Sequence, residues 1–305
     1  MRAIETIEIF VFTILTVTAF AQNTPLTTRE AQDLGWTSSM NFDGSANSQE
    51  RVFDVDSSVG YNFDQHWGFG IGVPLSFVSS SSSTTTSSAG GKNTSTVSSL
   101  NSLGNVYMDV NFKAKGDIAA YASTLTVAAP TGSTANGVST GRPNIGWNNH
   151  VDHAFDRLTP FVEAGFSNGL TDTRFYHRAY TTLGFVSQFT GGSTVDLGRS
   201  FSVGASLYDV LPSGQQKMFS KLVGRKSAFA AGAGKHGRAY ELTAETTGNA
   251  SLTRDNGGST WIEFSPGHIF DFQVGYTHSV HLALDTVSFN LGIDVGKLVK
   301  GAARQ

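Results

Sequence analysis

Residues 67–77 read Trp-Gly-Phe-Gly-Ile-Gly-Val-Pro-Leu-Ser-Phe, and this stretch decides the fold class. All of its odd-numbered residues are large and apolar, whereas its even-numbered residues are Gly, Pro or Ser. A β-strand points successive side chains to opposite faces, so the stretch gives a strand with one apolar face and one face of small residues. An α-helix would spread both sets around its circumference. The pattern therefore predicts a β-strand with an apolar environment on one side only.

The same alternation recurs along the chain and predicts an all-β fold of about twelve antiparallel strands. Segments of about ten residues that alternate between apolar and polar are typical of a transmembrane β-barrel, whose wall faces lipid outside and a polar lumen inside. We expect strands around residues 34–43, 53–63, 67–77, 105–113, 121–127, 144–155, 161–166, 183–185, 201–207, 240–245, 270–277 and 287–295. Residues 251–267 leave room for one further short strand.

The composition agrees with one large all-β domain. The 305 residues include 34 Gly, 22 Phe and long Ser/Thr runs, and only 15% of them are charged. Gly and hydroxyl residues are weak helix formers, whereas aromatic residues suit a pleated sheet. The chain has no cysteine, so stability must come from the strand ladder and packing rather than from disulfides. A net charge of -3 gives no indication of a nucleic-acid partner.

The N-terminus has the features of a signal peptide. Residues 9–19 are apolar, and Ala19-Phe20-Ala21 forms a small-x-small cleavage pattern before Gln22. Glu5 and Glu8 depart from the usual positive excess, and the alternative is an N-terminal membrane anchor, although the apolar run is short for a bilayer span. No later stretch approaches 18 apolar residues, so any membrane insertion must be by strands. We expect a signal peptide over residues 1–21, a periplasmic segment over 22–33, an outer-membrane barrel over 34–296 and a C-terminal tail over 297–305.

The predicted connectors alternate in length, as in outer-membrane barrels with short periplasmic turns and long extracellular loops. We expect short turns at residues 64–66, 114–117, 156–158 and 191–193, and long loops at 79–99, 131–142, 168–179 and 211–237. The Ser/Thr-rich stretch 79–99 has the composition of a flexible interdomain linker, but similar strands resume on both sides of it. An even strand number places both termini in the periplasm.

The strand register also predicts which ionisable side chains face the lumen, because charged groups are too costly to face lipid. The inward set consists of ten carboxylates, one lysine and one histidine. Its members are Asp43, Asp54, Asp56, Asp109, Lys113, His150, Asp152, Glu163, Glu241, Glu245, Asp271 and Asp294. A lumen with this many carboxylates implies either a water-filled passage that favours cations or a lumen filled by a basic segment.

A basic cluster in the longest predicted loop is a candidate for that filling segment. Its residues are Lys217, Lys221, Arg225, Lys226, Lys235 and Arg238. The alternative is that this loop is solvated at the cell surface and contacts anionic lipopolysaccharide. The sequence leaves both possibilities open.

No catalytic, metal or cofactor motif stands out. His150 and His153 would point to opposite faces of a strand, so they do not form a metal pair. Gly68, Gly70 and Gly72 alternate with large apolar residues and are small lumen-facing residues rather than a nucleotide-binding loop. An outer-membrane esterase or phospholipase would need a Ser, a His and an acid at the barrel rim, but no G-x-S-x-G elbow is present. We expect no enzymatic activity, no cofactor and no metal.

Several short segments, taken in order, resemble one family. They are residues 58–63, 67–77, 102–107, 128–132, 137–142, 159–163 and 180–185. In these segments the chain is similar to the MetA-pathway of phenol degradation family of outer-membrane transporters. The resemblance implies a barrel that passes small, often hydrophobic or aromatic compounds, with no binding residue to carry over position by position. The chain departs from a common assembly signal, because its last residues, from Gly296 to Gln305, contain no terminal aromatic.

The sequence therefore predicts an outer-membrane channel or transporter in which a small solute moves passively through a polar, acidic lumen gated by extracellular loops. Its expected partners are outer-membrane lipids, lipopolysaccharide, the barrel-assembly machinery and the solute. One alternative is a closed barrel with a structural or adhesive role, and a second is the outer-membrane esterase or phospholipase. A soluble β-sandwich is a further competitor, but it would bury its apolar face internally.

Overall fold

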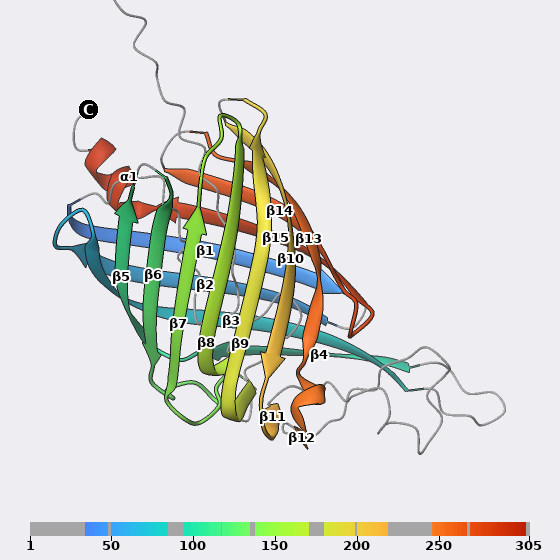
Figure 1. Ribbon diagram of the computed structural model, residues 1–305. Helices are drawn as coiled ribbons and strands as arrows, with labels where there is room; N and C mark the ends of the chain where they lie inside the picture. Colours follow the sequence, from blue (N-terminus) through green and yellow to red (C-terminus); the bar gives the residue numbers. More distant parts are fainter. Residues whose placement is uncertain are drawn as a thin grey trace, which may run out of the picture.

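Twelve antiparallel strands form a closed barrel (Figure 1). The computed structural model describes residues 34–47, 50–84, 94–116, 118–134, 138–170, 180–198, 200–218, 246–266 and 269–302. The wall strands are, in order around the ring, β1 (Gly35–Asn47), β2 (Glu50–Asn62), β3 (Trp67–Thr84), β5 (Tyr107–Lys115), β6 (Ala120–Ala128), β7 (Asn144–Asp152), β8 (Leu158–Leu170), β9 (Tyr180–Asp196), β10 (Phe201–Pro212), β13 (Asp255–Phe264), β14 (Phe270–Ser279) and β15 (Leu284–Asp294). The prediction of an all-β barrel of about twelve strands is confirmed.

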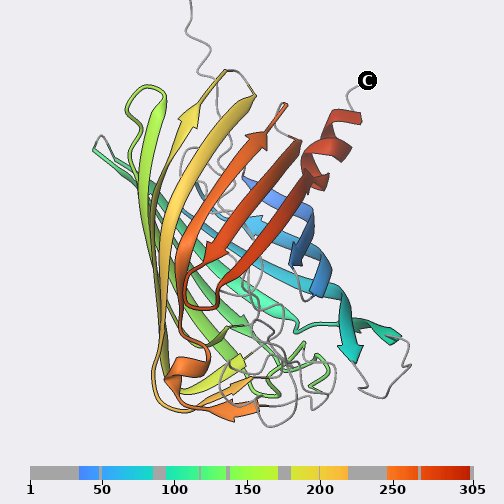
Figure 2. The same ribbon diagram turned by 90° about the vertical axis from the view of Figure 1, so that its right-hand side faces the viewer.

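Closure depends on the pairing of the first strand with the last. β1 pairs with β15 over nine positions, from Ser39 opposite Asp294 to Asn47 opposite Thr286. Figure 2 shows these two strands, from opposite ends of the chain, side by side. Because this ladder joins the ends of the sheet, the wall has no free edge.

One wall strand differs from the prediction. Between β10 and β14 the wall contains β13, which pairs with both neighbours. The expected strand at residues 240–245 therefore does not occupy this place in the wall, and it lies outside the described residues. β13 falls instead in the segment 251–267, which the sequence analysis marked only as room for a short strand.

The two faces of the wall differ in chemistry. On β7, Ile145 and Trp147 are 51% and 48% exposed, whereas Asn148 and His150 are 7% and 2% exposed. The outward face thus carries large apolar side chains in the open, and the inward face is polar and buried. A soluble β-sandwich would hide its apolar face instead, so this arrangement contradicts the sandwich alternative and fits a wall surrounded by lipid.

Aromatic side chains gather on the outward face at the end of the barrel where β1 begins and β15 ends, which we call the turn end. Trp36 lies edge-on to Tyr61, and Tyr61 lies edge-on to Phe63. Trp67 packs on Phe112 with ring centroids 4.8 Å apart. Such a girdle is typical of the level at which a barrel wall passes from hydrocarbon to lipid headgroups.

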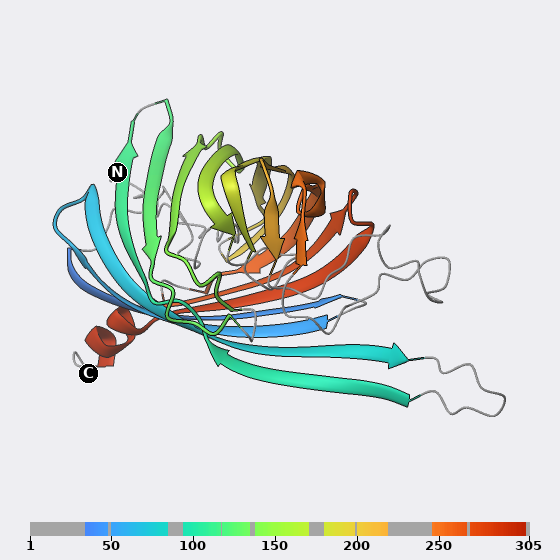
Figure 3. The same ribbon diagram turned by 90° about the horizontal axis from the view of Figure 1, so that it is seen from below.

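The strand β3 changes partner along its length. Its first part pairs with β5, and its second part pairs with β4 (Thr94–Leu103). The change falls at Pro74, which has no N–H to donate and whose carbonyl accepts the Gly104 amide at 2.8 Å. Figure 3 shows the β3–β4 hairpin projecting beyond the ring. The predicted loop 79–99 is therefore wrong in part, since the ladder continues to Thr84 and resumes at Thr94.

The turn end contains the short connectors. In the β2–β3 turn, Asp64 Oδ1 accepts the backbone N–H groups of His66 and Trp67 at 2.7 Å each, and these hydrogen bonds hold the pKa of the Asp64 carboxyl below its usual value. The predicted turn at residues 191–193 is wrong, because these residues lie within β9 and the chain turns only after Asp196. The glycines Gly191 and Gly192 are strand residues.

The remaining described elements lie at the two ends. At the opposite end, which we call the loop end, β11 (Gln216–Met218) pairs with β9 and with β12 (Thr246–Gly248), and the 3-10 helix η2 (Ala250–Leu252) precedes β13. At the turn end, β15 is followed by the helix α1 (Val295–Ala302), which occupies most of the expected C-terminal tail. Among the described residues, no helix is long and apolar enough to cross a membrane.

We expect Ala205→Cys and Thr260→Cys, placed together in this cysteine-free chain, to form a disulfide on oxidation. The two residues lie directly opposite in the β10–β13 ladder, and both are exposed. Opposed residues of this kind have Cβ atoms about 4.5–5.5 Å apart, which is close to disulfide geometry. Non-reducing gel mobility reports the bond.

The matched control pairs Ala205→Cys with Ser259→Cys, whose side chain is buried on the inward face, and it should not cross-link. If a disulfide formed between Ala205→Cys and Leu242→Cys but not between Ala205→Cys and Thr260→Cys, the position of β13 in the wall would be contradicted.

Candidate functional site

The inward face of the wall is the candidate functional site. Of the predicted lumen residues, six are buried there and four are partly exposed. The buried ones are Asp56, Asp109, His150, Asp152, Glu163 and Asp271, and the partly exposed ones are Asp43, Asp54, Lys113 and Asp294. Glu241 and Glu245 lie outside the described residues.

The basic loop cluster is described at one position only. Lys217 lies in β11, which pairs with β9 at the loop end. The other five residues, Lys221, Arg225, Lys226, Lys235 and Arg238, lie outside the described residues.

One polar network spans β2, β3, β5 and β6. The Tyr107 hydroxyl donates to Asp56 Oδ2 at 2.7 Å, and the Thr126 hydroxyl donates to Asp109 Oδ1 at 2.5 Å. All four side chains are buried. Tyr107 reaches Asp56 across β3 because Gly72 has no side chain, and a Cβ at that position would lie 2.2 Å from the Tyr107 ring and hydroxyl. The glycine thus lets Tyr107 hold Asp56 on the inward face, beside the strand that carries Asp109.

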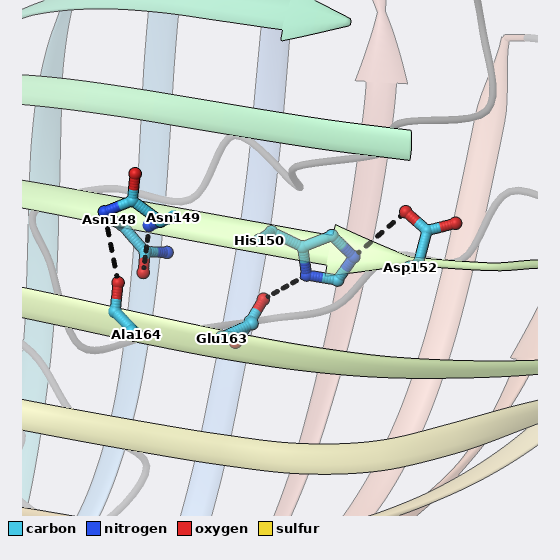
Figure 4. A network of polar contacts seen from close by, with 6 residues as sticks. All are labelled: Asn148, Asn149, His150, Asp152, Glu163 and Ala164. Carbon is cyan, nitrogen blue, oxygen red and sulfur yellow. Dashed lines mark hydrogen bonds and ion pairs between the residues drawn. The ribbon is translucent and has the colours of Figure 1, made fainter. Parts of the chain in front are cut away.

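A second network joins β7 and β8 (Figure 4). His150 Nδ1 lies 2.8 Å from Glu163 Oε1, and His150 Nε2 lies 3.3 Å from Asp152 Oδ1. His150 and Glu163 are opposite each other in the ladder, so the strand register brings them together. A protonated imidazole donates from both nitrogens, and the network then holds two carboxylates against one positive charge.

The neighbouring residue Asn149 points to the opposite face, as alternation requires. The hydroxyls of Tyr121 and Ser123 donate to its Oδ1 at 2.6 Å and 3.2 Å, and its amide donates to the Ala164 carbonyl at 3.5 Å. Polar groups that face lipid need partners within the protein, because hydrocarbon offers none. The outward network therefore makes Asn149 compatible with an apolar surrounding.

Two buried aromatic rings continue the inward face from the histidine. Phe161 stacks on His150 with ring centroids 5.6 Å apart, and its own centroid lies 6.3 Å from that of Trp261. Both rings lie over glycines, since a Cβ at Gly192 would meet Phe161 and one at Gly204 would meet Trp261. The indole nitrogen of Trp261 is buried and makes no hydrogen bond in the described part of the chain.

The missed strand β13 adds two acidic residues to the inward face. Asp255 accepts hydrogen bonds from the hydroxyls of Tyr208, at 3.1 Å, and Ser279. Glu263 accepts from Ser202 and Ser265 at 3.3 Å and 3.1 Å. The sequence signal was weak because the largest apolar residue of the strand, Trp261, faces inward and interrupts the apolar-outward pattern.

Carboxylates also face each other directly between strands. Asp43 of β1 is opposite Asp54 of β2, and Asn290 of β15 donates to Asp43 Oδ1 at 2.6 Å. In a low-dielectric wall such groups attract positive charge strongly. The described residues contain no cluster of three or more His, Asp or Glu side chains arranged to hold a metal ion. In the described part of the chain, the inward face thus carries acidic groups on several strands and no such metal cluster.

The barrel is similar in fold to solved outer-membrane channels. The COG4313 outer membrane channel from Pseudomonas putida F1 matches it with a TM-score of 0.53 and 9% identity, over 90% of this chain and 100% of that one. Weaker matches are the KdgM porin, with a TM-score of 0.45 and 8% identity over 84% of this chain and 98% of that one, and the Pseudomonas putida toluene transporter TodX, with 0.41 and 9% over 86% and 89%. No protein-family model and no curated protein matches the chain. The first match shows a shared β-barrel fold, and nothing finer follows at these identities.

We predict that Gly72→Ala lowers the free energy of unfolding by about 1–3 kcal/mol, because the new methyl group displaces Tyr107 from Asp56. The measurement is urea unfolding in detergent micelles, followed by tryptophan fluorescence.

Gly70→Ala is the matched control, because a Cβ there meets only the Val59 carbonyl at 3.8 Å. Equal stability of the two variants would show that the close contact of Tyr107 with Gly72 does not matter for the fold.

Proposed function

We propose that the chain is an outer-membrane channel that passes small solutes passively through the acidic interior of its barrel. The observation that carries the proposal is the contrast between the two faces of one closed wall. Exposed apolar side chains cover the outside, and buried polar and acidic side chains line the inside. Such a wall suits lipid outside and a hydrophilic path inside.

The orientation follows from the connectors. The turn end has short connectors, such as residues 63–66, and it contains both the start of β1 and the end of β15. In outer-membrane barrels the short turns are periplasmic. We therefore place the turn end in the periplasm and the loop end outside the cell, in agreement with export through the signal peptide expected at residues 1–21.

The charge of the interior favours cations and neutral solutes over anions. The inward face carries Asp56, Asp109, Asp152, Glu163 and Asp271 as buried carboxylates, and Asp255 and Glu263 add two more. Lys113 is the one lysine of the predicted inward set. A row of like charges beside a low-dielectric wall raises the local concentration of oppositely charged ions and repels those of the same sign.

We further propose that the solutes include small aromatic compounds. The resemblance to the MetA-pathway of phenol degradation family implies this class. Phe161 and Trp261 support it, because these two adjacent buried rings make part of the inward lining aromatic. The indole N–H of Trp261 is a donor that a phenolic oxygen can accept from.

A closed barrel with an adhesive role is the second candidate. The projecting β3–β4 hairpin favours it, because this ladder extends beyond the wall and offers a surface at the loop end. Planar-bilayer recording separates the two functions, since an adhesive barrel gives no conductance.

Replacing three inward carboxylates by Asp54→Asn, Asp56→Asn and Glu163→Gln should weaken cation selectivity. The expected result is a reversal potential closer to zero under a KCl gradient, because the interior loses negative charge. Heat-modifiable gel mobility verifies that the triple variant is folded.

The control for that experiment is Asp285→Asn, which removes one negative charge from the outward face, where Asp285 is 65% exposed. Selectivity should not change in this variant. If the triple variant is folded and conducts with unaltered selectivity, the inward carboxylates do not line the ion path.

Phenol should interrupt single-channel current more than benzoate does at the same concentration. The two molecules have similar size, but benzoate carries a negative charge that the acidic interior repels. Phe161→Leu should shorten the phenol-dependent interruptions, because it removes one of the two stacked rings. Equal block by both compounds, unaffected by this substitution, would argue against an aromatic path beside Phe161.

A further inference from the structure

The helix α1 is fixed to the outside of the barrel at its first turn. Asp294 Oδ1 accepts the backbone N–H of Lys297 at 2.8 Å and caps the helix, and the Lys297 ammonium lies 3.6 Å from Asp294 Oδ2. Gly296 lies against the backbone of Ser38 in β1, since a Cβ at Gly296 would be 3.4 Å from the Ser38 nitrogen. The last wall strand thus continues directly into a helix that is held against β1.

This position lies at the level of the aromatic girdle. Ser38 is two residues from Trp36, which is 66% exposed and packs on Tyr61. Figures 1 and 3 show α1 outside the ring of strands, next to β1. The helix therefore begins where the outward wall passes from hydrocarbon to headgroups.

The helix is amphipathic, as expected for a segment at the boundary between hydrocarbon and lipid headgroups. At about 100° per residue, the sequence of the helix puts its apolar positions 295, 298, 299 and 302 on one side and its lysine positions 297 and 300 on the opposite side. Gly296, which contacts the wall, lies between the two. The apolar side is thus turned away from both the wall contact and the lysines, and Leu298 is 43% exposed.

We propose that α1 is an interfacial anchor that lies on the phospholipid surface at the turn end, with its apolar side in the outer edge of the hydrocarbon and its lysines toward water and lipid phosphates. Short amphipathic helices with basic polar faces bind membranes in this way. The occupant of the apolar side is lipid because the helix begins on the outside of the wall beside Ser38, at the level of the aromatic girdle. The proposal rests on the membrane placement in the proposed function.

The anchor also stabilises the closing strand. β15 has to remain paired with β1 for the wall to be closed, and α1 attaches its end both to β1 and to the lipid surface.

The test uses single cysteines, which the cysteine-free chain allows. Leu298→Cys, Lys300→Cys and Ile71→Cys are each labelled with the polarity-sensitive fluorophore NBD. Each full-length protein is placed in vesicles of phosphatidylethanolamine and phosphatidylglycerol that contain nitroxide-labelled lipid. We expect the label at position 298 to be quenched several-fold more than the label at position 300, with emission shifted to the blue.

Ile71, an outward wall residue that is 49% exposed, reports the barrel itself. Strong quenching at position 71 with weak, equal quenching at 298 and 300 would overturn the anchor and leave the membrane barrel standing. Weak quenching at position 71 as well would overturn both the anchor and the proposed function.

Discussion

The pairing of β1 with β15 is the constraint on which the rest of the molecule depends. In hydrocarbon an unpaired backbone N–H or C=O group has no partner, so a sheet can span a bilayer only when its last strand returns to its first. Once the ring is closed, every wall residue must face either outward or inward. The chemistry of the two faces is then a consequence of alternation along each strand, as Asn149 and His150 show on β7.

Glycines on the inward face convert this alternation into a set of specific contacts. Gly72 lets Tyr107 cross to Asp56, and Gly204 gives Trp261 a flat position on the wall from which it reaches Phe161. A barrel with larger residues at these positions would point the same aromatic side chains into the lumen. Within residues 67–77, Gly72 therefore does more than fill the polar face, since it determines how close Tyr107 lies to Asp56.

Eleven of the wall strands could be predicted from the sequence because most of their outward residues are apolar. The strand β13 could not be predicted, because Trp261 points inward and positions 257 and 258 are both glycine. At Gly191 and Gly192 the sequence predicted a turn where the structure has a strand. These glycines lie inside β9, whose conformation is fixed by its pairing with β8 and β10. The position of His150 between Glu163 and Asp152 could be expected only in part, because the opposition of two residues on adjacent strands depends on the register of the ladder.

The inward carboxylates make the interior polar, but they do not gather into a single binding site. Each has a local partner, such as Tyr107 for Asp56 or Ser202 for Glu263, so the groups are distributed along several strands. This distribution fits the proposed passage, because a solute that meets many weak sites can leave each of them, whereas one strong site would hold it. The two aromatic rings beside His150 add apolar groups to the same inward face, and under the proposed function this mixed lining suits neutral, ring-shaped solutes as well as small cations.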